Sequence, residues 1–406
     1  MGTYAVTIWR LSMQQILDDI VIADFTQLMQ GGWAAQKLGD MGADVIKIEP
    51  PHGEPERQVA FAGEFFDGVA PGFLAKDRNK RSVALDLKSD EGRQAALDII
   101  AEADVLMENF RPDVMERLEL SYEDVREVNE DIIYVSASAY GSSGPYVERP
   151  GQDLLYQAMT GLTALTGRAD DPPTPGGTVF VDEHSATLIA YYTVSALFHR
   201  ERTGEGQKLE ASLLDSAVDF MCQEITFALN SENEPKRGEK MHGHHMLNPP
   251  YGIYETADSY LALGYSPLPL VAETLDLEDE LDTYESQAEL YEYRDQIHDV
   301  IEAETRQWQI DELVDHLSAA DIQAVEVAKP GEVADDPQIQ HNEMIIEVEH
   351  PNGGTFQTTG FPVDMSETEE AVTQRPPELG EHTAEVLAEL GYDDDKIAAI
   401  TGVNDT

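Results

Sequence analysis

The 406-residue chain carries 26 Lys and Arg against 79 Asp and Glu, a formal net charge of −53, and 41% of its residues are hydrophobic. That hydrophobic fraction is enough for a folded core, which excludes an intrinsically disordered chain, and the length allows two domains. The acids are spread along the chain, so the general surface is unsuited to nucleic acid or anionic membranes. Because such a surface repels itself unless salt screens it, we expect a cytoplasmic protein of a salt-accumulating halophile.

Targeting segments and disulfides are not expected. No stretch approaches the roughly 20 apolar residues of a membrane span, and the start lacks the basic and apolar regions of a signal peptide. Met13 is an alternative start residue to Met1. The single cysteine, Cys222, excludes an internal disulfide framework, and its amphipathic surroundings predict a buried structural thiol.

The first half of the chain alternates short β-branched runs with helical patterns. We predict helices over 31–42 and over 89–103, the latter capped by Ser89. The predicted strands are 20–25, 43–49, 82–87, 103–110 and 131–140. This alternation is typical of a Rossmann-like α/β domain with a parallel sheet covered on both faces. Neither G-x-G-x-x-G nor G-x-x-x-x-G-K-[ST] is present, so the ligand is not held by either phosphate fingerprint.

The sequence changes in character near residue 216 and again near residue 345. A helical stretch is followed by a polar loop, then by acidic helices, before strand and helix patterns resume. We predict that residues 1–215 form the N-terminal part of the large Rossmann-like domain, and that 251–330 form a smaller α+β domain. Residues 216–250 are then a linker, and 331–406 a linker and a return to the large domain.

Two clusters of polar residues are open to more than one interpretation. Lys76, Arg78, Lys80 and Arg81 lie in a basic stretch, which indicates either docking of a polyanion or pairing with the protein's own acids. The sequence "MHGHHM" at 241–246 offers soft metal ligands, but its spacing matches neither H-E-x-x-H nor a zinc finger, which favours a polar mobile loop.

Asp182 follows a strand-like run at 178–181 and stands where a helix begins that ends near Gly204. An aspartate at this place can cap the helix, because the first N–H groups of a helix lack partners. Alternatively it is a carboxylate nucleophile whose developing oxyanion is held by the same N–H groups. The local pattern alone favours the cap.

Several longer segments together resemble the family III CoA-transferases, which also include the α-methylacyl-CoA racemases. They include "DFTQLMQGGWAAQKLGDMGADVIKIEPPHGEPER", "RNKRSVALDLKSDEGR", "DVLMENFRPDVMERLEL", "GPYVERPGQDLLYQA" and "NPPYGIYETADSYLALG". The resemblance extends from about Ile20 to Gly402. It implies an interlocked homodimer, in which both ends of each chain build the large domain.

The resemblance also implies roles for individual residues. The family nucleophile lies about thirty residues after the "GxD" aspartate, here Asp153, and this position is Asp182. Racemases have a histidine where this chain has Gln152; glutamine cannot take a proton, so transfer is preferred over epimerisation. Gln152 and Asp153 are expected to line the acyl pocket. The residues expected to bind CoA are Leu28, Met29, Gln30, Asn79, Lys80, Arg81, Asn109, Phe110 and Arg117.

The reaction implied is transfer of CoA from an acyl-CoA to a carboxylic acid through an aspartyl-CoA thioester. It conserves the thioester energy and therefore needs neither ATP nor a metal. Together with the acidic composition, the resemblance suggests succinyl-CoA as donor and mesaconate or a similar short dicarboxylic acid as acceptor. The alternatives are a formyl- or carnitine-type transferase, a 2-methylacyl-CoA racemase, and a non-catalytic CoA-binding homologue.

Overall fold

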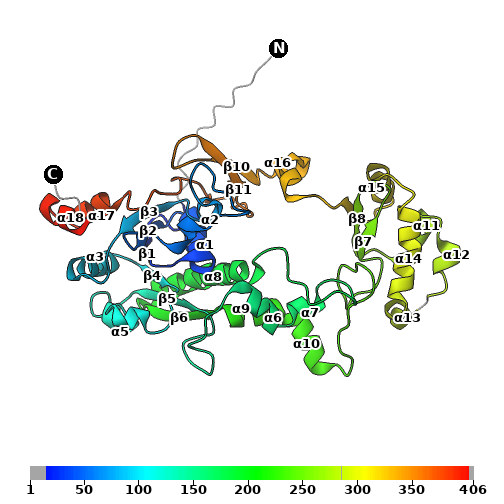
Figure 1. Ribbon diagram of the computed structural model, residues 1–406, viewed down its shortest axis with the longest axis horizontal. Helices are drawn as coiled ribbons and strands as arrows, with labels where there is room; N and C mark the ends of the chain where they lie inside the picture. Colours follow the sequence, from blue (N-terminus) through cyan, green and yellow to red (C-terminus); the bar gives the residue numbers. More distant parts are fainter. Residues whose placement is uncertain (1–14, 285, 402–406) are drawn as a thin grey trace, which may run out of the picture. The chain divides into compact units, whose positions relative to one another are not determined.

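The computed structural model describes residues 15–284 and 286–401, so both candidate start residues, Met1 and Met13, lie outside the described residues. The chain divides into two compact units (Figure 1). The first comprises the chain up to Tyr156, Val179–Phe220 and the chain from Pro337 onward; the second comprises Gln157–Thr178 and Met221–Asp336. In the described part of the chain, no helix is long and apolar enough to cross a membrane.

A parallel six-stranded sheet forms the centre of the first unit, which confirms the predicted α/β fold. Its strands are β1 (Val21–Asp24), β2 (Asp44–Glu49), β3 (Lys80–Ala84), β4 (Val105–Glu108), β5 (Ile133–Ser138) and β6 (Gln207–Ser212). Their spatial order is β3-β2-β1-β4-β5-β6, the doubly wound order in which the topology reverses between β1 and β4. In such sheets, ligands bind outside the carboxyl ends of the strands at this switch point.

Helices cover the sheet on both faces. The helices of this unit are α1 (Leu28–Asp40), η1 (Pro55–Gln58), α2 (Pro71–Lys76), α3 (Asp90–Ala101), α4 (Val114–Arg117), α5 (Tyr122–Arg126), α8 (Phe180–Thr203), α9 (Leu213–Phe220), α16 (Pro337–His341), α17 (Thr383–Glu389) and α18 (Asp394–Thr401), and α6 (Asp153–Met159) begins in it.

One face of the sheet packs on α1 and α8, which lie side by side (Figure 1). The other face packs on α3, α5 and α17. Alternate residues of each strand therefore enter different cores: Leu106 faces α3, whereas Val105 and Met107 face α1 and α8. As predicted, the hydroxyl of Ser89 caps α3 and accepts the Gly92 N–H.

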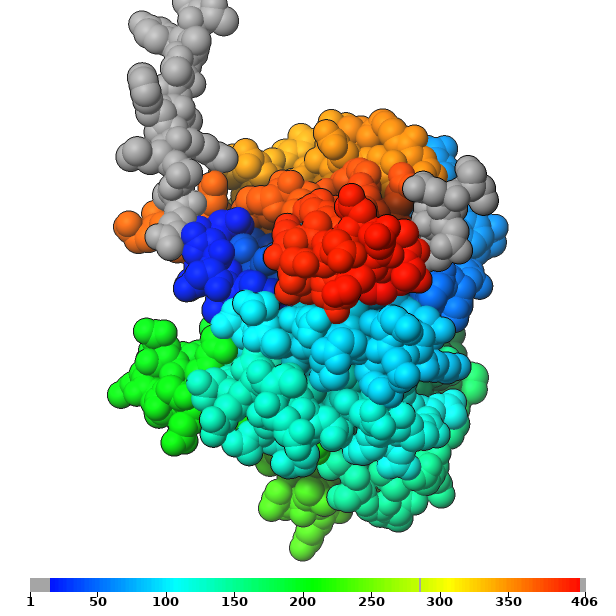
Figure 2. All heavy atoms as spheres, turned by 90° about the vertical axis from the view of Figure 1, so that its left-hand side faces the viewer, coloured from blue at the N-terminus to red at the C-terminus, as the bar shows by residue number. Residues whose placement is uncertain are grey.

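The C-terminal part of the chain returns to this unit. An antiparallel hairpin of β10 (Ile345–Glu349) and β11 (Thr355–Thr359) precedes α17. Val386 and Leu387 of α17 are buried in the same core as α3, and the red C-terminal helices lie on the surface against the cyan segment (Figure 2).

The second unit is a smaller α+β structure, as predicted. Its elements are α7 (Leu162–Leu165), α10 (Cys222–Asn230), β7 (Gly252–Glu255), β8 (Tyr260–Leu263), α11 (Leu268–Thr274), α12 (Glu278–Leu281), α13 (Gln287–Glu292), α14 (Arg294–Thr305), α15 (Ile310–Ala319), β9 (Ala324–Glu326) and η2 (Pro330–Asp335). β7, β8 and β9 form an antiparallel sheet, and the core includes Tyr254, Leu261 and Ile297.

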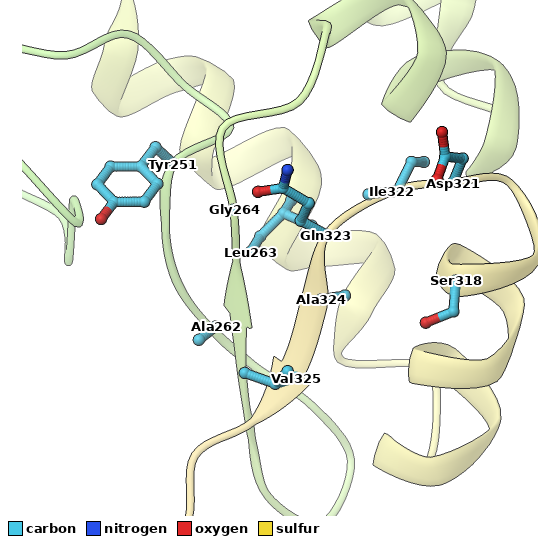
Figure 3. A pocket seen from close by; sticks show the side chains of 10 residues that line it. All are labelled: Tyr251, Ala262, Leu263, Gly264, Ser318, Asp321, Ile322, Gln323, Ala324 and Val325. Carbon is cyan, nitrogen blue, oxygen red and sulfur yellow. The ribbon is translucent and has the colours of Figure 1, made fainter. Parts of the chain in front are cut away.

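A cavity of about 490 Å³ lies beside the antiparallel sheet of this unit (Figure 3). Its lining includes Tyr251, Gln323 and the single acid Asp321, and no cation. It contains none of the residues expected to bind CoA or to react.

Three expectations differ from the structure. Residues 178–181 form no strand, because α8 already begins at Phe180. Cys222 is exposed, contrary to the predicted burial, since α10 buries none of its residues. The segment Gln157–Thr178, which lies inside the range predicted for the large domain, belongs to the second unit.

Candidate active site

Asp182 is the third residue of α8. Ala186, Ile189, Ala190 and Leu197 of this helix are buried against the sheet, which fixes the helix and the direction of its first turn. The helix ends at Gly204, which has φ of 75°, the left-handed conformation expected of a glycine that terminates a helix.

Asp153, not Asp182, accepts the hydrogen bonds at the start of this helix. Its Oδ2 accepts the N–H of Val181 at 2.7 Å and the N–H of Asp182 at 3.1 Å. Asp153 is 6% exposed and opens α6. The capping interpretation of Asp182 is therefore wrong, and two of the first-turn N–H groups considered for an oxyanion are occupied by Asp153.

The carboxylate of Asp182 accepts no hydrogen bond from any residue that the structure describes. Burial, followed by the negative charge of Asp153, raises the pKa of Asp182 to about 7, although Lys76 lowers it. A carboxylate that lacks hydrogen-bond donors and is partly withdrawn from water is more basic and more reactive when ionised. Asp182 thus has the properties of a nucleophile.

The expected CoA-binding residues after β1 and β4 meet at the switch point of the sheet. Asn109 joins the two loops, since its amide donates to the Gln27 carbonyl and accepts the Gln27 N–H, both at 2.8 Å. Leu28 is 43% exposed there, and Met29 is partly exposed. Gln30, in contrast, is buried and donates to the Ser185 hydroxyl at 2.8 Å, which links α1 to α8.

Phe110 lines a cavity of about 120 Å³ that extends from the carboxyl end of β4 along alternate residues of β5 and β6. Arg111 and Lys208 line the same cavity, and sequence reasoning assigned no role to Lys208. Glu108 lies at its base, where burial raises the pKa of this carboxyl to about 7. Lys208 already pairs with Glu210 at 2.8 Å, whereas no described residue pairs with the Arg111 side chain, which leaves Arg111 available to a phosphate group of an extended ligand.

Lys80 lies inside the protein. It is 0% exposed, and its Nζ donates to the Gly32 carbonyl and to Asp77, both at 2.8 Å. Burial alone would raise the pKa of Asp77, but the ammonium groups of Lys80 and Lys47 lower it to about 2. These contacts support pairing with the protein's own acids over contact with a polyanion.

Asn79 and Arg81 hold the returning C-terminal segment. Asn79 Oδ1 accepts the Thr373 N–H at 2.8 Å, and its amide donates to Ala371 at 2.7 Å. Arg81 pairs with Asp44 at 2.6 Å and with Glu389 of α17 at 2.9 Å.

Gln152 and Arg117 are both exposed, and neither side chain contacts another described residue through a hydrogen bond or ion pair. Gln152 directly precedes Asp153, whereas Arg117 ends α4. Both are accessible to a ligand.

Histidines of the segment 241–246 pair with acidic side chains of the second unit. His242 pairs with Asp295 and His244 with Glu224, each at 2.9 Å. The His242 side chain is 1% exposed, so it is part of a packed structure and not of a mobile polar loop. Among the described residues, no group of three or more potential ligands is arranged to hold a metal.

Sequence reasoning missed the pair formed by Lys76 and Glu56, whose charges both act on Asp182. Lys76 was assigned only to the basic stretch, and nothing in the sequence connects it to an acid twenty residues earlier.

Comparison with known proteins yields consistent matches over the chain. The sequence model of the family described as "CoA-transferase family III" matches residues 17–383 of this chain. The succinyl-CoA:mesaconate CoA-transferase of Haloarcula marismortui is 34% identical over 388 residues, covering 93% of this chain and 97% of that protein. The succinyl-CoA:glutarate CoA-transferase of Mus musculus is 31% identical over 389 residues, covering 94% and 88%. The crystal structure of a CAIB/BAIF family protein from Brucella suis superposes with a TM-score of 0.81 at 30% identity, covering 93% of this chain and 99% of that one.

Proposed function

The chain belongs to CoA-transferase family III and is a CoA-transferase; from this premise we propose that it moves CoA from succinyl-CoA to a short dicarboxylic acid such as mesaconate, with Asp182 as nucleophile. The observation that carries the proposal is the partly buried Asp182 carboxylate, which accepts no hydrogen bond in the described structure and whose pKa is raised to about 7. The substrate class is supported by relatives named for succinyl-CoA with mesaconate and with glutarate.

The proposed reaction has two symmetrical halves. Asp182 attacks the thioester carbonyl of the donor, which forms a mixed anhydride and releases CoA thiolate. The thiolate attacks the Asp182 carbonyl carbon, which leaves an aspartyl-CoA thioester and the free donor acid. The acceptor carboxylate then attacks this thioester, and the released thiolate attacks the acyl carbonyl of the new anhydride. Asp182 is regenerated, the acceptor carries CoA, and no ATP or metal takes part.

Water must be excluded while the anhydride exists. The burial that raises the pKa of Asp182 contributes to this exclusion. Asp153 holds the first turn of α8 through the N–H groups of Val181 and Asp182, so in this proposal it positions the nucleophile. Gln152 offers no titratable base, which supports transfer over racemisation.

We further propose assembly into the interlocked homodimer. Two elements of the first unit expose large apolar side chains that would be covered by a second copy: Tyr191, Tyr192 and Phe198 on α8, and Leu154 and Leu155 on α6. Exposed apolar side chains that gather on neighbouring elements mark association surfaces.

An acceptor screen tests the substrate proposal. The enzyme is incubated in high salt with succinyl-CoA and one acid at a time, and new thioesters are identified by mass spectrometry. We expect mesaconyl-CoA or the thioester of another C4–C5 dicarboxylic acid, and none with the Asp182→Asn variant. Transfer only to formate, oxalate or carnitine would contradict the substrate class, and loss of an α-deuteron from a 2-methylacyl-CoA without transfer would favour a racemase.

A further inference from the structure

Lys76 and Glu56 form a buried ion pair that the proposed reaction does not use. Lys76 ends α2, Glu56 lies in η1, and Nζ and Oε2 are 2.9 Å apart. The side chains are only 2% and 3% exposed. Despite this short distance, Nζ of Lys76 makes no hydrogen bond of acceptable geometry with any described residue.

An ammonium group has three N–H donors, and a buried donor without an acceptor destabilises the protein. The neighbouring buried lysines differ in this respect. Lys80 donates to Gly32 and Asp77, and Lys47 lies 2.8 Å from Glu54 and donates to the Thr26 carbonyl at 3.2 Å. Of these three buried lysines, Lys76 is the one whose ammonium N–H groups remain available to another acceptor.

The pair lies in the surroundings of Asp182. α2, which Lys76 ends, and α8, whose first turn carries Asp182, both pack against α1 (Figure 1). In addition to the effects of burial and Asp153, Lys76 lowers and Glu56 raises the pKa of Asp182, so both charges reach the nucleophile.

We propose that Lys76 determines specificity by receiving the second carboxylate of a dicarboxylic acyl group bound at Asp182; this inference rests on the proposed function. When one carboxyl group of such an acid is bound as thioester or anhydride, the other remains an anion and needs a cation and donors in a site shielded from water. The free N–H groups of Lys76 meet this need. Glu56 balances the charge of Lys76 in the empty site, so no isolated charge is buried there.

The test compares acids that differ only in the second carboxylate: succinate against butanoate, and mesaconate against 2-methylbut-2-enoate. Lys76→Met removes the cation, and the double variant Glu56→Gln/Lys76→Met removes it while keeping the buried charge at zero. Lys88→Met is the matched control, because Lys88 is exposed and its side chain makes no described hydrogen bond or ion pair.

We expect both Lys76 variants to lose roughly ten- to hundredfold in kcat/KM for the dicarboxylic acids, the effect of one charge-assisted contact. Their activity with the monocarboxylic acids and their inhibition constant for free CoA, which carries no acyl group, stay within about twofold of the wild type, and Lys88→Met behaves as the wild type throughout.

An equal loss on both kinds of acid, a parallel rise in the inhibition constant of free CoA, or unchanged kcat/KM for dicarboxylic acids would overturn the assignment of Lys76. These outcomes are separate from failure of the proposed function, in which the wild-type enzyme itself forms no thioester with any dicarboxylic acid.

Discussion

The environment of the Asp182 carboxylate favours its protonated form. Burial and then the charge of Asp153 raise its pKa to about 7, far above the range of an exposed aspartate. The same features make the ionised group more basic, because partial burial reduces its hydration and no described residue donates a hydrogen bond to it. A carboxylate of this kind is suited to attack a thioester, whereas a capping carboxylate would have a lowered pKa.

The pH dependence of the reaction follows from this pKa. Only the ionised carboxylate attacks, and a raised pKa means that most of the Asp182 population is protonated below pH 7. We therefore expect kcat/KM to increase with pH and to level off above an apparent pKa near 7. Measuring kcat/KM in high salt over about two pH units on either side of neutrality checks this. A rate that stays constant down to the acidic end of that range would exclude Asp182 as the titrating nucleophile.

A substitution at Lys80 tests whether this lysine of the basic stretch stabilises the fold or binds CoA. Lys80→Met breaks a fully buried set of pairs and leaves Asp77 without its nearest cation, so we expect a loss of about 3–5 kcal/mol in the free energy of unfolding. The KM for the CoA donor of the folded variant should stay near that of the wild type. Chemical denaturation and steady-state kinetics measure the two quantities; a tenfold higher KM with unchanged stability would instead place Lys80 on a phosphate of CoA.

At the scale of elements, the start of α8 depends on α6. The Asp153 carboxylate accepts two N–H groups of the first turn of α8 and carries a charge that raises the pKa of Asp182. One side chain thus holds the position of the nucleophile and also adjusts its ionisation.

Two substitutions at Asp153 separate these effects. Asparagine keeps an acceptor but removes the charge, so we expect the acidic limb of the pH profile to move to lower pH with little change in stability. Alanine removes the acceptor as well and should also lower the free energy of unfolding by about 1–2 kcal/mol. If the asparagine variant keeps the wild-type pH profile, the charge of Asp153 does not act on the nucleophile.

The sequence predicted the regular elements well where local patterns determine them. The sequence predicts five strands of the parallel sheet from their β-branched and apolar runs, although β3 begins at Lys80, before the predicted residue 82. It does not predict β6, which reads as the polar alternation "QKLEAS" of an edge strand. The β-branched and aromatic residues of 178–181 predict a strand. In the structure, Phe180 and Val181 form the first turn of α8, since Val181 is buried and its N–H is bound by Asp153.

Pairing between distant residues could not be predicted. Asp182 was identified from a family resemblance, but its neighbours Glu56 and Lys76 come from other elements and carry no local signal. The same holds for Arg81, whose partner Glu389 follows 308 residues later.

At the scale of the whole molecule, the net charge of −53 makes repulsion among acidic side chains the main electrostatic effect on the folded state. Exposed ion pairs contribute little individually, so the cations present do not offset the repulsion among the acids. The chain nevertheless buries substantial cores in both units. Its folded state should therefore depend on the solvent to screen the surface.

Lowering the salt concentration tests this dependence. The Debye length is about 10 Å at 0.1 M salt and about 2 Å at 2 M, so repulsion across the surface is strong only in the dilute solution. We expect loss of helical circular dichroism and of activity at 0.1 M KCl, and retention of both at 2 M. Equal spectra and equal rates at the two concentrations would contradict adaptation to high salt.

The central claim is that Asp182 carries CoA during the reaction, and the most direct measurement is the mass of the protein after brief incubation with succinyl-CoA and acid quenching. The account predicts CoA on the peptide that contains Asp182 in the wild type and in Asp153→Asn. In Asp182→Asn the account predicts a folded protein with no adduct and with activity reduced by several orders of magnitude. An adduct on Asp153 or Glu183, or normal turnover by Asp182→Asn, would contradict it.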